Sequence, residues 1–328
     1  MPQPLNAPAI TLYAPGLWGR AGWPERPPAV LTKALSRARR QAWAVEGYTA
    51  RALALLDLPA DAGLAALARL GEGRGPDDRW WVRCDPVHLA ADGDRLLLLD
   101  NETVTLDTRD AARLGGLVAE VFAADGGVIE IAAPARWYLS LAAPEPLQAS
   151  DMAEVAGRNI RDFLPGGNAR YWRTRLNEAQ MVLHEALVGR HGGEASRGEV
   201  NSVWLWGPGY APKVRGAARP RVFSDDVLMT GMARAAQASV AALPAGPADL
   251  DLTQSSLIVL RGAQGPVQYG DTGAWLAFLE TFVAVWWGPL AAAARAGRLG
   301  RLSLIGDRGP VHTVEPGRWR TLARRWRR

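Results

Sequence analysis

Cysteine is almost absent from this sequence, and long apolar runs are missing. Cys84 is the only cysteine among 328 residues, so one chain can form no internal disulfide and no cysteine-based zinc or iron–sulfur site. Residues 1–9 lack the charged start and apolar core of a secretory leader. No apolar run approaches the roughly 18 to 20 residues that cross a bilayer. We therefore expect a cytoplasmic protein without a transmembrane segment.

A net positive charge is also lacking outside one short segment. The formal net charge is +5, but the last eleven residues, 318–328, contain six arginines and no acid, which leaves −1 for the rest of the chain. A nucleic-acid-binding face needs basic residues spread over a surface. We therefore expect no general nucleic-acid surface.

The tail itself, residues 318–328, has apolar residues at helical spacing. Trp319, Leu322, Ala323 and Trp326 fall on one face, with arginines on the others, which predicts a short basic amphipathic helix. Packing of this helix on its own domain is the favoured interpretation. Contact with an acidic partner, a nucleic acid or a membrane surface is the alternative.

The rest of the chain alternates between strand and helix patterns. This alternation predicts an α/β fold with a largely parallel sheet sandwiched between helices. The turn at residues 91–94 predicts an antiparallel hairpin-like segment around residues 80–100. We expect one domain, with an N-terminal half at 10–142 and a C-terminal half at 150–317.

Individual elements follow from periodicity and caps. Ser224 is the predicted N-cap of a helix that starts with Asp225 and Asp226, and Asp107 or Thr108 caps another. The predicted strands are 10–13, 80–84, 95–99, 128–131, 137–141, 203–206, 255–260 and, as the last one, 302–305. The predicted helices are 29–40, 47–56, 62–70, 107–124, 168–187 and 272–294.

The most distinctive segment is a buried strand that runs into a glycine-rich turn at residues 201–209. On the helix at 168–187, the residues Asn177, Gln180 and His184 form a polar stripe beside an apolar face. We expect a pocket there for a small ligand, lined by Asn177, Gln180, His184, Asn201, Trp204, Trp206 and Gly207. The alternative is structural: a hydrogen-bonded stripe that steadies Asn201, with both tryptophans in the core.

A second polar group is predicted at Asp85, His88 and Arg136. Asp85 could orient the His88 imidazole for acid–base chemistry. A proline-containing turn, in which Asp85 accepts backbone N–H groups beside Pro86, explains the same residues and is the favoured interpretation.

Four segments, in chain order, resemble the hallmark segments of the bacterial regulatory protein family of the RpfE type. They are DPVHL at 85–89, RWYL at 136–139, NEAQMVLH at 177–184 and NSVWLWGPG at 201–209. That family in turn resembles archaeal-type cofactor-independent phosphoglycerate mutases of the alkaline phosphatase superfamily. The resemblance implies an alkaline-phosphatase-like α/β sheet between helices.

The superfamily's reaction uses two divalent metals held by Asp and His, with a Ser or Thr nucleophile. At the matching strand ends this chain has Ala14 in place of an aspartate, Arg261 in place of a histidine, and Arg308 after Asp307. Arginine cannot ligate a metal. Asp307 is therefore the only surviving candidate ligand, and none of the four histidines falls where the metal site needs one.

We therefore expect no metal, no cofactor and no catalytic residue, and a non-catalytic regulatory or interaction protein. Its partner would be an unidentified protein or a small phosphorylated ligand. Two alternatives stay open: a phosphoglycerate mutase or phosphatase-type metalloenzyme with a divergent site, and a sensor of phosphorylated metabolites.

Overall fold

The computed structural model describes residues 8–20, 24, 28–191, 198–213 and 219–316, without the side chains of 188–191. The predicted basic tail, 318–328, lies outside the described residues. Contacts between Cα atoms divide the chain into two compact units, Met1–Asp57 with Arg215–Arg328, and Leu58–Val214. We call them unit 1 and unit 2 and describe each by itself. The single domain and its halves stay a prediction.

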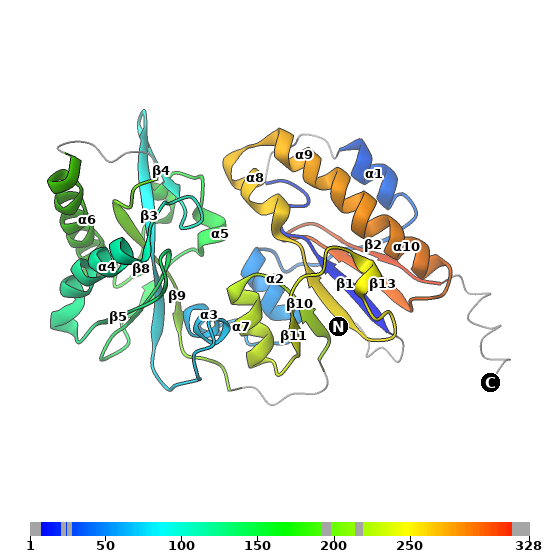
Figure 1. Ribbon diagram of the computed structural model, residues 1–328, viewed down its shortest axis with the longest axis horizontal. Coiled ribbons are helices and arrows are strands. Elements are labelled where there is room, and N and C mark those ends of the chain that lie inside the picture. The colour runs from blue at the N-terminus through cyan, green and yellow to red at the C-terminus, as the bar shows by residue number, and fades with distance from the viewer. Residues whose placement is uncertain (1–7, 21–23, 25–27, 192–197, 214–218, 317–328) are drawn as a thin grey trace. The chain divides into compact units, whose positions relative to one another are not determined.

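Unit 1 contains a seven-stranded, mostly parallel sheet in the order β11-β10-β12-β1-β13-β14-β2 (Figure 1). Strand β14 is antiparallel to β13, and β2 is antiparallel to β14, while the other strands run parallel to their neighbours. The strands are β1 (Ala9–Tyr13), β2 (Arg39–Gln41), β10 (Arg221–Phe223), β11 (Val240–Ala241), β12 (Ser256–Val259), β13 (Arg301–Ile305) and β14 (Val311–Val314).

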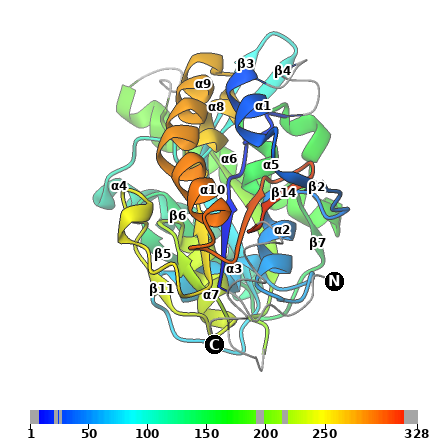
Figure 2. The same cartoon turned by 90° about the vertical axis from the view of Figure 1, so that its right-hand side faces the viewer.

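Helices cover both faces of this sheet, which confirms the predicted sandwich. One apolar cluster joins Ile10, Leu12 and Leu304 of the sheet to Trp275, Trp287 and other residues of the helices on that side. In Figure 1 and Figure 2 the helices α9 and α10 run along the sheet. The helices of this face are α1 (Ala29–Leu35), α8 (Gln264–Tyr269), α9 (Thr272–Thr281) and α10 (Gly288–Arg295); those of the other are α2 (Tyr48–Leu55) and α7 (Val227–Ala235).

One continuous helical segment, Thr272–Arg295, is long and apolar enough to cross a membrane by length and composition. Our expectation that no stretch approaches such a length is therefore wrong. The segment joins α9 and α10 through a π-helical turn at Phe282–Trp287. Its inner side belongs to the core of unit 1, where Trp275, Leu279 and Phe282 are buried. The core helix of a soluble protein passes the same test, so the segment is weak evidence for a membrane.

Unit 2 contains an antiparallel sheet in the order β4-β3-β6-β5, with β9 also paired to β3. The helices α4 and α6 share an apolar cluster with Val82, Cys84 and Leu205 of the sheet, whereas α3 packs against β3 and β9. The strands are β3 (Trp81–Asp92), β4 (Arg95–Leu99), β5 (Val128–Ala133), β6 (Arg136–Ser140), β7 (Leu147–Gln148), β8 (Gly166–Gly167) and β9 (Ser202–Gly209). The helices are α3 (Leu64–Gly71), α4 (Thr108–Phe122), α5 (Met152–Val155) and α6 (Ala169–His191).

Most of the predicted elements are confirmed, including the β3–β4 hairpin, in which Asp92 pairs with Arg95. Asp107 caps α4 by accepting the Asp110 N–H. The apolar face predicted for α6 is buried: Trp172, Leu176, Ala179, Leu183 and Leu187.

Three local predictions in unit 1 are wrong. The helix predicted at 29–40 ends at Leu35, because residues 39–41 pair with β14 at the edge of the sheet. Strand β13 is not the last strand, since β14 follows it. Asp226, not Ser224, caps α7: its carboxylate accepts the Met229 N–H, while the Ser224 hydroxyl accepts the Asp226 N–H.

Two local predictions in unit 2 are also wrong. Asp85 and Pro86 lie inside β3 and not in a turn. Proline is tolerated there because β3 pairs with β6 only over 81–83 and with β4 only from residue 88, so one side of the strand is open at this point. The strand predicted at 203–206 continues through the expected turn to Gly209, which pairs with Trp81.

Two side chains of α6 test how unit 2 is stabilised. We expect Leu183→Ala to lower the free energy of unfolding by about 2 to 5 kcal/mol, because it leaves a cavity between α6 and the sheet. Met181 is 64% exposed on the same helix, so Met181→Ala should change it by less than about 0.5 kcal/mol. Urea unfolding measures both. Equal effects of the two substitutions would contradict this packing.

Candidate functional site

Four parallel strands of unit 1 end side by side. Because β10, β12, β1 and β13 are neighbours and run the same way, their carboxyl ends share one edge of the sheet. Ligand sites in open α/β sheets form at this edge. The segments that follow the strands there carry the carboxylates Asp226 and Asp307, an exposed third one at Asp225, and the arginines Arg261 and Arg308.

The Asp226 carboxylate is held by three donors. Its Oδ1 accepts hydrogen bonds from the Tyr48 hydroxyl at 3.0 Å and the Met229 N–H at 2.7 Å. Its Oδ2 lies 2.9 Å from Arg261 Nη1, and Arg261 Nε donates to Gln264. Burial, followed by the charge of Asp226, raises the pKa of Tyr48 well above 10.0. Tyr48 is therefore a neutral donor, and both oxygens of Asp226 have partners within the protein.

The Asp307 carboxylate is also bound internally. Its Oδ1 accepts the Gly16 N–H at 2.8 Å, which ties the end of β13 to the end of β1. Arg308 Nε lies 3.5 Å from Oδ2, an ion pair without hydrogen-bond geometry. Gly16 has φ of 78°, and a side chain there would lie 2.8 Å from the Ala263 carbonyl oxygen. Only glycine fits this approach.

A third arginine, Arg51, fixes the loop after β13 and is completely buried. Its guanidinium donates to the carbonyl oxygens of Val45 at 2.6 Å, Gly306 at 2.8 Å and Gly309 at 2.7 Å. A buried charge is tolerated only with such partners. Arg51 thus serves as a structural cation at the carboxyl edge.

Arginine side chains therefore supply the positive charge beside the carboxylates Asp226 and Asp307 at this edge. Among the described residues, no three His, Cys, Asp or Glu side chains are grouped so that they could hold a metal ion. A hollow of about 350 Å³ lies beside the ends of β1 and β13, next to Arg308. Its lining consists of Leu17, Trp18, Pro24, Pro28, Glu46, Arg308, Gly309 and Pro310. The carboxyl edge can therefore bind a ligand through hydrogen bonds and ion pairs.

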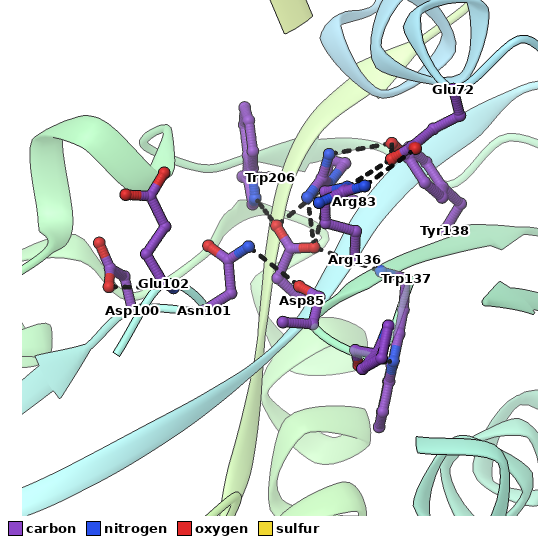
Figure 3. A network of polar contacts seen from close by, with 12 residues as sticks. Glu72, Arg83, Asp85, Asp100, Asn101, Glu102, Arg136, Trp137, Tyr138 and Trp206 are labelled. Atoms are coloured by element: carbon purple, nitrogen blue, oxygen red, sulfur yellow. Dashed lines mark hydrogen bonds and ion pairs between the residues drawn. The ribbon is translucent and has the colours of Figure 1, made fainter. Parts of the chain in front are cut away.

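A second polar group lies inside unit 2 and is drawn in Figure 3. Asp85 is fully buried on β3, two residues from Arg83. Arg83 Nη2 lies 2.6 Å from Asp85 Oδ1, and Trp206 Nε1 donates to Oδ2 at 2.8 Å. Burial raises the pKa of Asp85, although Arg83 and Trp206 oppose the rise. Burial alone would lower the pKa of Arg83, but Asp85 and Tyr138 raise it, so Arg83 stays charged.

The network continues toward the end of α3. Arg83 Nη1 donates to the Tyr138 hydroxyl at 3.0 Å, and Tyr138 donates to Glu72 at 3.1 Å. Arg136 binds the same Glu72 carboxylate through Nε at 2.6 Å and Nη2 at 3.1 Å. Figure 3 shows this chain from Trp206 to Glu72. It connects strands β9, β3 and β6 to α3, which is a structural role.

Asp85, His88 and Arg136 are not brought together as a catalytic group. His88 lies three residues from Asp85 on β3, so their side chains point to opposite faces. The Nδ1 atom of His88 lies 2.7 Å from the Glu199 carbonyl oxygen, within hydrogen-bond distance. Arg136 binds Glu72, as described above. The acid–base arrangement therefore does not form in this structure.

The predicted pocket is only partly assembled. A hollow of about 500 Å³ is lined by Asn177, Gln180, His184 and Asn201, together with Leu89, Leu96 and Met181. The Asn201 side-chain amide binds the main chain of β3. It accepts the Leu89 N–H at 2.7 Å and donates to the Leu89 carbonyl oxygen at 3.0 Å. It therefore continues the strand pairing with its side chain.

The remaining predicted pocket residues lie elsewhere. Trp204 donates to the Ser150 carbonyl oxygen, and Trp206 to Asp85. At Gly207, where φ is 62°, a side chain would lie 2.7 Å from the Cβ atom of Leu64 on α3. The glycine-rich end of β9 thus allows the helix α3 to approach the strand.

Four residues of these networks were not predicted from the sequence: Arg51, Glu72, Arg83 and Tyr138. The alternation Arg83-Cys84-Asp85 in an apolar strand was a usable signal, because adjacent strand residues face opposite sides and both charges must share one face. Arg51 gave no such signal, since its partners are main-chain carbonyls up to 258 positions away.

The likeness of this chain to known proteins is confined to its fold. No family model and no curated protein matches the sequence. The fold is similar to the PH0037 protein from Pyrococcus horikoshii, with a TM-score of 0.55 and 12% identity over 95% of this chain and 88% of that one. Cofactor-independent phosphoglycerate mutase from Thermoplasma acidophilum DSM 1728 gives a TM-score of 0.38 and 15% identity over 95% and 90%. The first likeness concerns the fold alone, and the second is too weak to bear on it.

The buried pair Arg83–Asp85 yields a prediction for stability. Arg83→Met should lower the free energy of unfolding by about 3 to 5 kcal/mol, because it leaves the Asp85 carboxylate buried without its counter-ion. The double variant Arg83→Met/Asp85→Leu should recover much of this loss. Arg136 has a 38% exposed side chain, so Arg136→Met should cost less than about 1 kcal/mol. If Arg83→Met lost less stability than Arg136→Met, the assignment of Arg83 and Asp85 as a buried ion pair would be contradicted.

The loss of stability in Arg83→Met should depend on pH. Without Arg83, burial raises the pKa of Asp85 with less opposition, so the folded chain binds a proton more tightly than the unfolded chain does. Such a carboxyl group destabilises the fold most at high pH, and its cost shrinks as the pH falls through the folded pKa toward 3.8. Urea unfolding at pH 7 and pH 5 should therefore show a smaller loss at pH 5. An equal loss of stability at the two pH values would contradict the explanation that the buried Asp85 carboxylate causes it.

Proposed function

We propose that this protein is a non-catalytic regulatory or interaction protein of the RpfE type, built on a phosphoglycerate-mutase-like scaffold whose two-metal site has been lost. The observation that carries the proposal is the state of two carboxylates at the carboxyl edge of unit 1. Asp226 is bound by Arg261, Tyr48 and a main-chain N–H, and Asp307 by Gly16 and Arg308.

The physical reason is the competition between a guanidinium and a metal for the same oxygens. A divalent metal needs several lone pairs at fixed distances. Arg261 and Arg308 offer none, and they repel a cation. The four family-like segments at 85–89, 136–139, 177–184 and 201–209, which resemble regulatory proteins, support the same proposal. The expected absence of a cofactor stays a prediction.

A metalloenzyme with a divergent site is the first alternative. It would have to free Asp226 or Asp307 from its internal donors and bring further ligands to the edge. Each such bond to a charged group stabilises the fold by about 1.5 to 3 kcal/mol, which the metal would have to replace.

A sensor of phosphorylated metabolites is the second alternative. The observation in its favour is the hollow in unit 2, where Asn177, Gln180 and His184 of α6 line one surface with Asn201. Gln180 donates to the Ser202 hydroxyl at 3.2 Å, so the stripe is also bonded to β9. Exposed amide and imidazole groups can donate to a phosphate.

Stability measurements separate a structural pair from a metal site. In a metal site without its metal, neighbouring carboxylates repel each other, so an Asp→Asn change is neutral or stabilising. In an internal ion pair the same change removes charge-assisted bonds. We therefore expect Asp226→Asn to lower the free energy of unfolding by about 1 to 3 kcal/mol in buffer that contains EDTA. Asp307→Asn should lower it by less than about 1 kcal/mol, because its ion pair with Arg308 is 3.5 Å long and Arg308 is 37% exposed.

The matched control is Asp225→Asn, an exposed neighbour outside the two clusters, which should change stability by less than about 0.5 kcal/mol. Wild-type protein should also fail to interconvert 3-phosphoglycerate and 2-phosphoglycerate, and to hydrolyse p-nitrophenyl phosphate, with Mn²⁺, Mg²⁺ or Zn²⁺. Metal-dependent turnover that disappears in Asp307→Asn would reject the proposal.

A further inference from the structure

A basic hollow lies at the margin of unit 1, where β2 and β14 pair. Its volume is about 480 Å³. The residues that line it are Arg37, Arg39, Arg295, Thr313, Val314 and Glu315. None of them belongs to the carboxyl-edge clusters or to the candidate pocket of unit 2.

Three elements bring these residues together from distant parts of the chain. Arg39 is the first residue of β2 and pairs with Thr313 of β14, so the two side chains project from the same face of the sheet. Arg37 precedes β2 by two residues. Arg295 ends α10, whose Leu290 packs in the same core cluster as Val314.

The lining carries an excess of positive charge. Arg37, Arg39 and Arg295 are exposed, and none of them forms an ion pair with another described residue. The one acidic side chain in the lining, Glu315, is bound by Arg301 through Nε at 2.7 Å and Nη2 at 2.6 Å. Three guanidinium groups around one hollow therefore lack a counter-charge among the described residues.

The chemistry of the lining selects a type of ligand. Guanidinium groups present paired N–H donors that match phosphate oxygens, and the Thr313 hydroxyl adds a further donor. A volume of about 480 Å³ lies within the range of roughly 300 to 1,000 Å³ that small-molecule sites occupy. One phosphate cannot neutralise three arginines, whereas two phosphoryl groups can.

We propose that Arg37, Arg39 and Arg295 form a binding site for a small molecule with two phosphoryl groups. The site is independent of the proposed function, since it shares no residue with the carboxyl edge. It gives unit 1 a way to respond to a phosphorylated compound without any reaction.

Isothermal titration calorimetry with inorganic pyrophosphate and orthophosphate tests the site. The wild-type chain should bind pyrophosphate at least about tenfold more tightly than orthophosphate. Arg39→Gln and Arg295→Gln should each weaken pyrophosphate binding by about tenfold or more, since each removes a charged donor. Because these side chains are exposed, thermal unfolding of both variants should match that of the wild type.

Two further proteins make the test specific. Arg298→Gln removes an exposed arginine three residues beyond Arg295 that does not line the hollow, and it should change the affinity less than about twofold. A chain that ends at Pro316 lacks all six arginines of the tail and should bind equally well. The proposal is overturned if wild type does not bind pyrophosphate, if Arg298→Gln weakens binding as much as Arg295→Gln, or if the shortened chain loses binding.

Discussion

Pairing between arginine and aspartate holds the carboxyl edge of the seven-stranded sheet together. The parallel strands β10, β12, β1 and β13 end there, and the segments that follow them must be held at the edge of the sheet. Arg261 on Asp226 ties the end of β12 to the start of α7, and Asp307 on the Gly16 N–H ties β13 to β1. The loop after β13 depends in turn on the buried Arg51. Cations of the protein itself therefore organise the edge.

The same type of interaction organises unit 2 in a more buried setting. Arg83 and Asp85 share one face of β3, and Trp206, Tyr138 and Glu72 extend their bonds to the neighbouring strands and to α3. A buried pair of this kind contributes little net stability compared with apolar residues, but it penalises any packing that separates the two charges. We infer that it fixes how β9, β3 and β6 align.

Local pattern was enough to predict much of the fold. The buried face of α6 and the β3–β4 hairpin depend on periodicity and turn chemistry that neighbouring residues carry. The edge strand β2 and its neighbour β14 were missed or misassigned because they are short, and their pairing joins residues 39–41 to 311–313. The hollow formed by Arg37, Arg39 and Arg295 was missed for the same reason.

The candidate site was less predictable than the fold. Polar spacing on α6 placed Asn177, Gln180 and His184 on one surface, and the structure places Asn201 beside them. Trp204 and Trp206 were expected there too, but they lie elsewhere because their indole N–H groups bind Ser150 and Asp85. Sequence spacing indicates which side chains share a face, and only tertiary structure determines which hydrogen-bond partners they find.

We propose that arginines hold the carboxyl edge of unit 1 and that it does not bind a pair of metal ions. Titration of the metal-free chain with Mn²⁺ by isothermal calorimetry tests this most directly, with Asp307→Asn measured in parallel. We expect wild type and Asp307→Asn to give the same weak heats, without a saturable site. Saturable binding of two Mn²⁺ ions per chain that is lost in Asp307→Asn would contradict it.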